Sequence, residues 1–161
     1  TSFTVAADLL KRYAAIQLDV TDDESIQTAK VQITKIAPSI DALVNNAAIL
    51  LDDRDEGDAK PSYDRARQTM EVNFYGCMKV TEAFMPIMAE RGRVVNVSSG
   101  LGYLSQVSKT LQHRLASPTA TVKDVLAIAD EYIRAVKQGH HAETGFADNI
   151  YGTSKLLVIA W

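Results

Sequence analysis

Short apolar runs alternate with amphipathic helical segments along this chain, and this alternation constrains the fold more than any other feature. The apolar runs occupy residues 14–20, 42–44 and 93–97, and the segments 21–36 and 63–88 repeat apolar side chains at helical spacing. Strands that alternate with helices are typical of βαβ units, whose strands pair in parallel. We therefore predict an α/β fold with a doubly wound, mainly parallel sheet.

Residues 100–150 interrupt this alternation. Within them, Thr121 and Asp124 have the spacing of a capping pair, and they precede an amphipathic helix that Gly139 should end. A final helix should begin near Tyr151. We predict that residues 1–161 are part of one domain and that residues 100–150 form a helical insertion within it.

Local signals refine the remaining element ends. Pro86 should bend or loosen the last turns of the helix predicted over 63–88. Residues 3–13 are expected to form the end of a helix, and the crowded acidic residues of 51–61 predict a loop.

Composition excludes several function classes. A net charge of −3 argues against a general binder of nucleic acid or anionic membranes. No apolar run approaches the length of a membrane span. The one cysteine, Cys77, excludes an internal disulfide, suits a reducing compartment, and should be a buried thiol because it lies in an apolar helical stripe. We therefore expect a cytoplasmic protein with no nucleic-acid or membrane partner.

Metal chemistry is not expected either. His113, His140 and His141 have no supporting Cys or His cluster, and the acidic run over residues 52–58 does not follow the calcium-loop pattern.

Tyr151 and Lys155 are four residues apart, so on a helix they lie on one face, one turn from each other. A phenol is a poor general acid or base near neutral pH, and a nearby ammonium group favours its ionised form. The spacing is therefore that of a proton-transfer pair, although the same spacing also fits an ordinary helix face.

Polar side chains also follow the apolar runs. Ser99 and Asn46 stand where ligands bind in an open α/β sheet, beyond the carboxyl ends of strands, although each side chain could instead cap or hold a neighbouring loop. Asp19 could accept a hydrogen bond from an adenine amino group or cap the next helix. Asn73 interrupts an apolar helix face; it is either exposed or, if buried, in need of hydrogen-bond partners such as a water chain toward Lys155.

These signals occur together in the order and spacing of the short-chain dehydrogenase/reductase family, which the chain resembles over essentially its whole length. The resemblance is carried by Leu18-Asp19-Val20, Asn45-Asn46-Ala47, Val72-Asn73-Phe74-Tyr75-Gly76, Ser98-Ser99, and Tyr151 with Lys155. It implies a Rossmann-like fold in which Tyr151 exchanges the proton and Ser99 orients the substrate. It also implies that Lys155 lowers the pKa of the Tyr and binds the ribose, and that Asn73 anchors a relay water. The implied contacts to the adenine and its ribose are Asp19, Val20 and Asn46.

The spacing between Ser99 and Tyr151 resembles that of one subgroup of the family. The two residues are 52 positions apart, whereas most family members separate them by little more than a dozen. A helical insertion of this kind is similar to that of the monomeric carbonyl reductases, which use NADPH to reduce ketones, aldehydes and quinones. In that subgroup the insertion covers a surface that other members use to dimerise. The resemblance thus implies NADP(H) as cofactor, a small-molecule carbonyl substrate and a monomer.

The chain departs from the family pattern in three ways. Ala48 replaces the Gly that usually completes Asn-Asn-Ala-Gly, and neither the family's glycine-rich phosphate loop nor its segment after the Tyr and Lys helix is among the 161 residues. We therefore expect an incomplete sheet that supplies strands 3, 4 and 5 of the order 3-2-1-4-5-6-7. A segment of this kind should neither fold stably nor bind the cofactor alone.

The leading hypothesis from the sequence is an NADPH-dependent carbonyl reductase. Two alternatives remain open, a catalytically silent Rossmann-like binding protein and an NAD-dependent alcohol dehydrogenase of the same family. The sequence does not name the carbonyl substrate.

Overall fold

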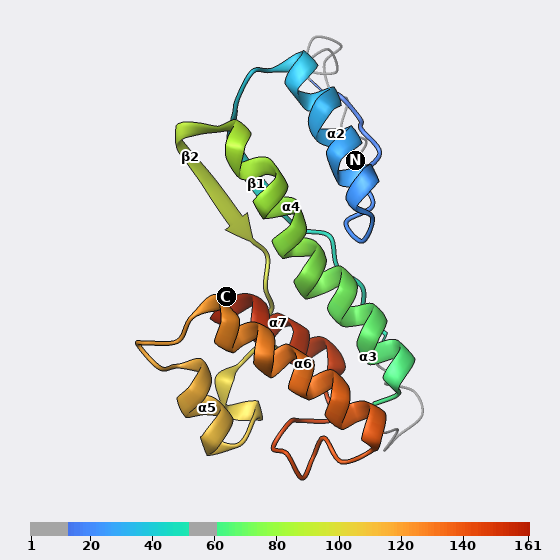
Figure 1. Cartoon of the computed structure of the whole chain (residues 1–161), viewed down its shortest axis with the longest axis vertical. Helices are drawn as coiled ribbons and strands as arrows, with labels where there is room; N and C mark the ends of the chain where they lie inside the picture. Colours follow the sequence, from blue (N-terminus) through green and yellow to red (C-terminus); the bar gives the residue numbers. More distant parts are fainter. Residues whose placement is uncertain (1–12, 52–60) are drawn as a thin grey trace, which may run out of the picture.

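The structure, a computed structural model, describes residues 13–51 and 61–161. The elements, in chain order, are α2 (Asp23–Ile36), β1 (Ile40–Asn45), α3 (Tyr63–Met70), a π-helical turn (Glu71–Gly76), α4 (Cys77–Phe84), a 3-10 turn (Met85–Ile87), β2 (Met88–Asn96), a second 3-10 turn (Leu104–Gln106), α5 (Lys109–Leu115), α6 (Val122–Gln138) and α7 (Ile150–Ala160). Figure 1 shows α3, the π-helical turn and α4 as one long rod. The sheet and α2 lie beside its α4 end, and α5, α6 and α7 lie beside its α3 end.

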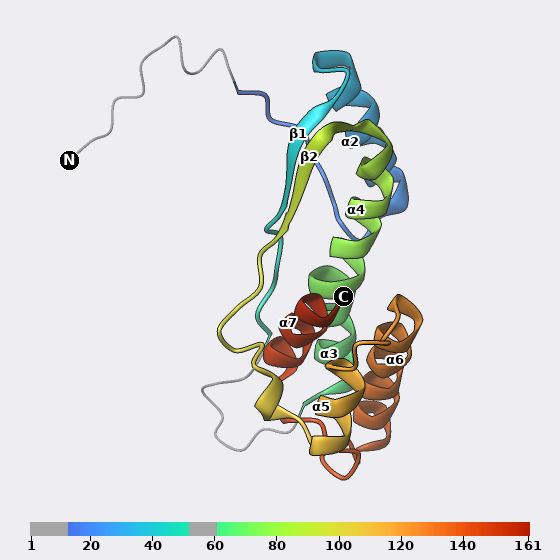
Figure 2. The same ribbon diagram turned by 90° about the vertical axis from the view of Figure 1, so that its left-hand side faces the viewer.

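The two strands pair in parallel, as the alternation of elements predicts. Ala42 pairs with Arg93 and Asn45 with Asn96, while Ile40 pairs with Met88 across an irregularity in the register. The strand predicted over 93–97 is thus confirmed in its core but begins earlier, at Met88. Figure 2 shows that α2 and α4 lie on the same side of the sheet.

The strand predicted over residues 14–20 is not formed, so this prediction is wrong. A strand exists through hydrogen bonds to a neighbouring strand, and the sheet in the part of the chain that the structure describes contains β1 and β2 alone. Ile16 and Val20 instead pack against a small apolar cluster of α2 and α4. The segment therefore contributes to packing without entering the sheet.

Helix boundaries follow the local signals closely. Asp22 caps α2 by accepting hydrogen bonds from the backbone N–H groups of Glu24 and Ser25. Thr121 and Asp124 form the predicted capping box of α6, which ends at Gly139 with a left-handed φ of 76°. The final helix includes Tyr151, as expected. The short α5 is not predicted, although Ser108 caps it by accepting a hydrogen bond from the N–H of Leu111.

The helix predicted as one piece over 63–88 has two breaks. Six residues, Glu71–Gly76, form a π-helical turn, and Met85–Ile87, which include Pro86, tighten into a 3-10 turn before β2 begins. The second break lies at the predicted place, because proline cannot donate a backbone hydrogen bond, but the chain there tightens and does not loosen. The first is not visible in the apolar pattern, and it carries Asn73.

Two hydrophobic clusters hold these elements together. One lies between α2, α4 and the sheet and contains Ile26, Ala29, Val80 and Phe84. The other joins α3 and the π-helical turn to α5, α6 and α7, with Met70, Phe74, Ile128, Tyr132 and Leu157 all nearly fully buried. The opposite face of the sheet is open, since Val44 and Val95 are 57% and 47% exposed.

Cys77 is buried, as predicted. The helix end predicted over 3–13 and the acidic loop predicted over 51–61 fall almost wholly outside the described residues. None of the helices within 13–51 and 61–161 is long and apolar enough to cross a membrane. In the same ranges, no three His, Cys, Asp or Glu side chains converge in a way that could hold a metal ion.

Candidate active site

The first two turns of α7 place Tyr151 and Lys155 on one side of the helix. Asn149 caps the first turn, accepting a hydrogen bond from the N–H of Gly152 at 2.7 Å. Tyr151 is half-buried, whereas Lys155 is 3% exposed, with its Nζ 5.7 Å from the centre of the Tyr151 ring. The predicted pairing of these two side chains on one helix face is therefore present.

Lys155 is a buried cation held by a backbone carbonyl. Its Nζ donates to the carbonyl oxygen of Val97, directly after β2, at 2.7 Å. Burial lowers the pKa of Lys155, and the nearby Cys77 thiol opposes this effect in part. An ammonium group carries three donors, so two remain for groups that enter the site.

Asn73 is buried and connects three parts of the chain. Its Oδ1 accepts from the N–H of Ile49 at 2.8 Å, and its Nδ2 donates to Ile49 O and to Ser154 Oγ, both at 3.0 Å. The residue is 1% exposed. Asn73 thus ties the segment after β1 to α7 next to Lys155, through Ser154 and not through Lys155 itself.

The two serines after β2 have different surroundings. Ser98 Oγ donates to the carbonyl oxygen of Lys155 at 2.9 Å, which fastens the strand end to α7. Ser99 is partly exposed, and its Oγ accepts from the N–H of Leu101 at 3.2 Å. The hydroxyl proton of Ser99 is therefore not needed for that contact and can be donated.

The residues predicted to contact the adenine side of a cofactor have mixed surroundings. Asn46 is exposed after β1, while its neighbour Asn45 has a structural role, donating to Thr81 Oγ1 and Asn96 Oδ1 at 2.8 Å. Asp19 is exposed and accepts from the N–H and hydroxyl of Thr21, hydrogen bonds that lower the pKa of its carboxyl. It does not cap α2, because Asp22 does. Val20 packs against Gly76 in the π-helical turn, where an added Cβ would lie 2.8 Å from Val20 Cγ2.

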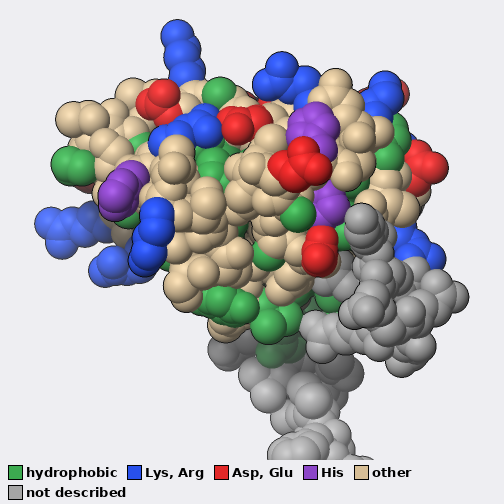
Figure 3. Space-filling model, turned by 90° about the horizontal axis from the view of Figure 1, so that it is seen from below, with side chains coloured by type: hydrophobic (Ala, Val, Ile, Leu, Met, Phe, Trp, Pro, Cys, Tyr) green, Lys and Arg blue, Asp and Glu red, His purple; other side chains and the backbone are tan. Residues whose placement is uncertain are grey.

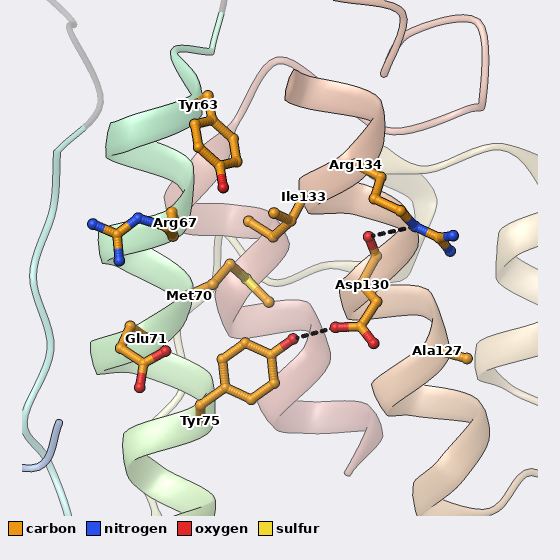
Figure 4. Close-up of a pocket in the computed structure, with 9 residues that line it drawn as sticks. All are labelled: Tyr63, Arg67, Met70, Glu71, Tyr75, Ala127, Asp130, Ile133 and Arg134. Carbon is orange, nitrogen blue, oxygen red and sulfur yellow. Dashed lines mark hydrogen bonds between the residues drawn. The ribbon is translucent and has the colours of Figure 1, made fainter. Parts of the chain in front are cut away.

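A pocket of about 620 Å³ lies elsewhere, between α3 and α6. Figure 4 shows its apolar floor of Met70 and Ile133 between two tyrosines, with Tyr75 Oη donating to Asp130 at 3.0 Å. Burial and this hydrogen bond raise the pKa of Tyr75. The pocket contains none of the four predicted catalytic side chains, so it is distinct from the site at α7.

Seen from the end that carries α5, basic and acidic side chains are interspersed over the surface (Figure 3).

Comparison with known sequences decides the family. The sequence model described as short chain dehydrogenase matches residues 4–128. The chain belongs to this family. Its relatives include carbonyl reductase [NADPH] 1 of Bos taurus, 33% identical over 142 residues that make up 87% of this chain and 50% of that protein. The same-named protein of Sus scrofa is 34% identical, with 87% and 48% covered. The chain therefore spans about half the length of these curated relatives.

Solved structures agree on the fold. Salutaridine reductase from Papaver somniferum superposes with a TM-score of 0.78 at 25% identity, covering 89% of this chain and 60% of that one. Menthone neomenthol reductase from Mentha piperita gives 0.77 at 25% identity, with 89% and 62% covered. The partial parallel sheet with its helices is consistent with an incomplete Rossmann-like domain, as the sequence predicts.

Proposed function

We propose that the protein containing this chain is an NADPH-dependent carbonyl reductase that converts ketones, aldehydes or quinones to alcohols. The observation that carries the proposal is the buried Lys155 ammonium, held by Val97 O and placed 5.7 Å from the Tyr151 ring. Burying a cation costs free energy. A buried ammonium group is explained if it stabilises negative charge that forms during the reaction. The similarity to carbonyl reductases supports the same reaction class.

Each side chain then has a distinct task. Tyr151 donates its phenolic proton to the carbonyl oxygen, and the charge of Lys155 stabilises the oxygen left on Tyr151. Ser99 donates its hydroxyl proton as a hydrogen bond to the same carbonyl oxygen and so orients the substrate. Asn73 fixes α7 through Ser154 and, as the family resemblance implies, anchors a water that returns a proton to Tyr151.

The residues present fit parts of a nicotinamide cofactor. Two protons of Lys155 Nζ remain for ribose hydroxyls, because Val97 O uses one. Asn46 is exposed after β1, and Asp19 and Val20 complete the contacts that we propose on the adenine side. Bound NADPH supplies the hydride, so that carbonyl, NADPH and one proton give alcohol and NADP⁺.

We also propose that the protein is a cytoplasmic monomer without nucleic-acid or membrane partners. Helix α6 lies in the insertion predicted over residues 100–150 and packs against α3. The resemblance implies that this insertion covers a surface that other members of the family use to dimerise. Light scattering during size-exclusion chromatography should give the mass of one chain; a stable dimer would contradict this part of the proposal.

The main test is carbonyl-dependent oxidation of NADPH by the full-length protein. Tyr151→Phe should lower turnover by about a hundredfold or more, in the range of a lost general acid, with NADPH affinity nearly unchanged. Tyr75→Phe is the matched control, since it removes a phenolic hydroxyl whose partner, Asp130, lies outside the site. Folded protein that binds NADPH without turnover would support the silent binding protein, and turnover of an alcohol with NAD alone would support the alcohol dehydrogenase.

A further inference from the structure

Gln106 bridges the loop after Ser99 and the first turn of α7. Its Nε2 donates to the carbonyl oxygen of Leu101 at 3.0 Å and to that of Gly152 at 3.3 Å. Leu101 is two residues beyond Ser99, and Gly152 directly follows Tyr151. One side-chain amide therefore contacts the backbone beside both proposed catalytic hydroxyls.

The two backbones that Gln106 bridges are in direct contact. A Cβ added at Gly152 would lie 2.7 Å from Leu101 O, and one added at Gly102 would lie 2.9 Å from the carbonyl carbon of Lys155. Glycine at both positions allows this approach. The approach also brings two carbonyl oxygens, Leu101 O and Gly152 O, close enough to share one donor group. Two carbonyl oxygens cannot bond to each other, so each needs a hydrogen-bond donor. The two N–H bonds of a primary amide match this need.

The rest of the Gln106 side chain is not arranged for stability. Its Oε1 is buried and finds no hydrogen-bond donor among the residues that the structure describes. An unsatisfied buried acceptor lowers stability, so an apolar side chain of similar length would be the better choice if this position only filled space. The amide is therefore best explained by the two hydrogen bonds that it donates.

We propose that Gln106 is a positioning residue that sets the separation of Ser99 and Tyr151 by bridging Leu101 O and Gly152 O. This inference rests on the proposed function, because it gives the two hydroxyls a shared carbonyl oxygen to bind. Gln106 itself does not touch the substrate. Loss of the bridge lets the loop after Ser99 and the first turn of α7 move apart, so that both hydroxyls no longer reach one oxygen.

The test compares two glutamines in the full-length protein. Gln106→Met keeps the length of the side chain and removes both donors. Gln112→Met is the matched control, because Gln112 also donates its amide to a backbone carbonyl, Val107 O at 2.7 Å, but from α5. Since a misplacement of about 1 Å can cost roughly a hundredfold in rate, we expect Gln106→Met to lower kcat about tenfold to a hundredfold with little change in KM for NADPH. Gln112→Met should stay within about twofold of wild type. A kcat of Gln106→Met within about twofold of wild type would overturn the proposal.

Two further measurements separate positioning from a general structural effect. In a Tyr151→Phe background, Gln106→Met should cause little additional loss, because residues that act as a unit are non-additive; a full second loss would overturn the proposal. Gln106→Glu should lose turnover at neutral pH and regain part of it as the pH falls, since the protonated carboxyl can again donate one hydrogen bond. A flat ratio to wild type across pH would count against the bridge, and this variant serves if Gln106→Met does not fold.

The proposed function can fail separately from this inference. No carbonyl-dependent NADPH oxidation by the wild type, or full activity of Tyr151→Phe, would reject the reductase regardless of Gln106. A working wild type that depends on Tyr151, together with an unaffected Gln106→Met, would reject the positioning role alone.

Discussion

Replacement of Asn73 by alanine should strongly destabilise the protein, because this buried amide joins separate parts of the chain. The side chain is 1% exposed and makes three hydrogen bonds, two with Ile49 and one with Ser154. At about 1 kcal/mol net for each bond, their loss costs about 3 kcal/mol. The N–H and C=O of Ile49 also lose their partner beside a buried helix, which raises the expected cost to about 3–5 kcal/mol.

Urea denaturation of the full-length protein without NADPH measures this cost directly. At roughly 2–4 °C per kcal/mol for a domain of this size class, the matching drop in Tm is about 10 °C. The control is Gln68→Ala, which removes an exposed amide from α3 and should change stability by less than about 0.5 kcal/mol. A loss below about 1 kcal/mol for Asn73→Ala would mean that Asn73 does not join the segment after β1 to α7.

Two further variants test the electrostatics. Burial lowers the pKa of Lys155 below the usual lysine value of 10.5, so the folded state disfavours the charged ammonium group. The buried charge therefore reduces the stability of the fold at neutral pH, and this reduction is relieved as the pH rises toward 10.5. Lys155→Met should abolish turnover, because it removes the charge beside Tyr151, but it should not cause a matching loss of stability. The stability of the variant relative to wild type, measured by urea denaturation, should decline as the pH rises. A loss of several kcal/mol at neutral pH would refute this reasoning. Hydrogen bonds from the side chain and backbone of Thr121 lower the pKa of Asp124 below the usual 3.8, so its contribution is present above 3.8 and lost as the pH falls through the lowered pKa. Asp124→Asn should be less stable than wild type at neutral pH, with the gap in thermal denaturation closing in acid; a gap independent of pH would show that the carboxylate charge is not involved.

Signals that act over a few residues are sufficient for much of the fold. The cap of α2, the capping box of α6 with its glycine stop, and the effect of Pro86 all depend on neighbours within one helical turn. The pairing of Tyr151 with Lys155 depends only on the period of a helix. These features can be predicted because their physical cause lies in the local sequence.

The errors share a different cause. The segment 14–20 has the composition of a strand, but a strand requires a partner that no local signal supplies. The π-helical turn at Asn73 adds a single residue to a helix, which the apolar repeat is too coarse to reveal. The hydrogen bonds from Gln106 to Gly152 and from Asn45 to Thr81 have no local signal, because each joins residues far apart in the sequence.

The π-helical turn also determines how the two hydrophobic clusters are oriented. An α-helix advances by about 100° per residue, so one additional residue rotates everything that follows by that angle. Met70 before the turn packs in the cluster of α6 and α7, which Met78 after the turn also joins. Val80 and Phe84, further along α4, pack against α2 and the sheet. The turn therefore acts as a phase shift in a single continuous rod. A one-residue deletion within 71–76 would make a more regular helix, yet it would turn one of the two apolar faces away from its cluster.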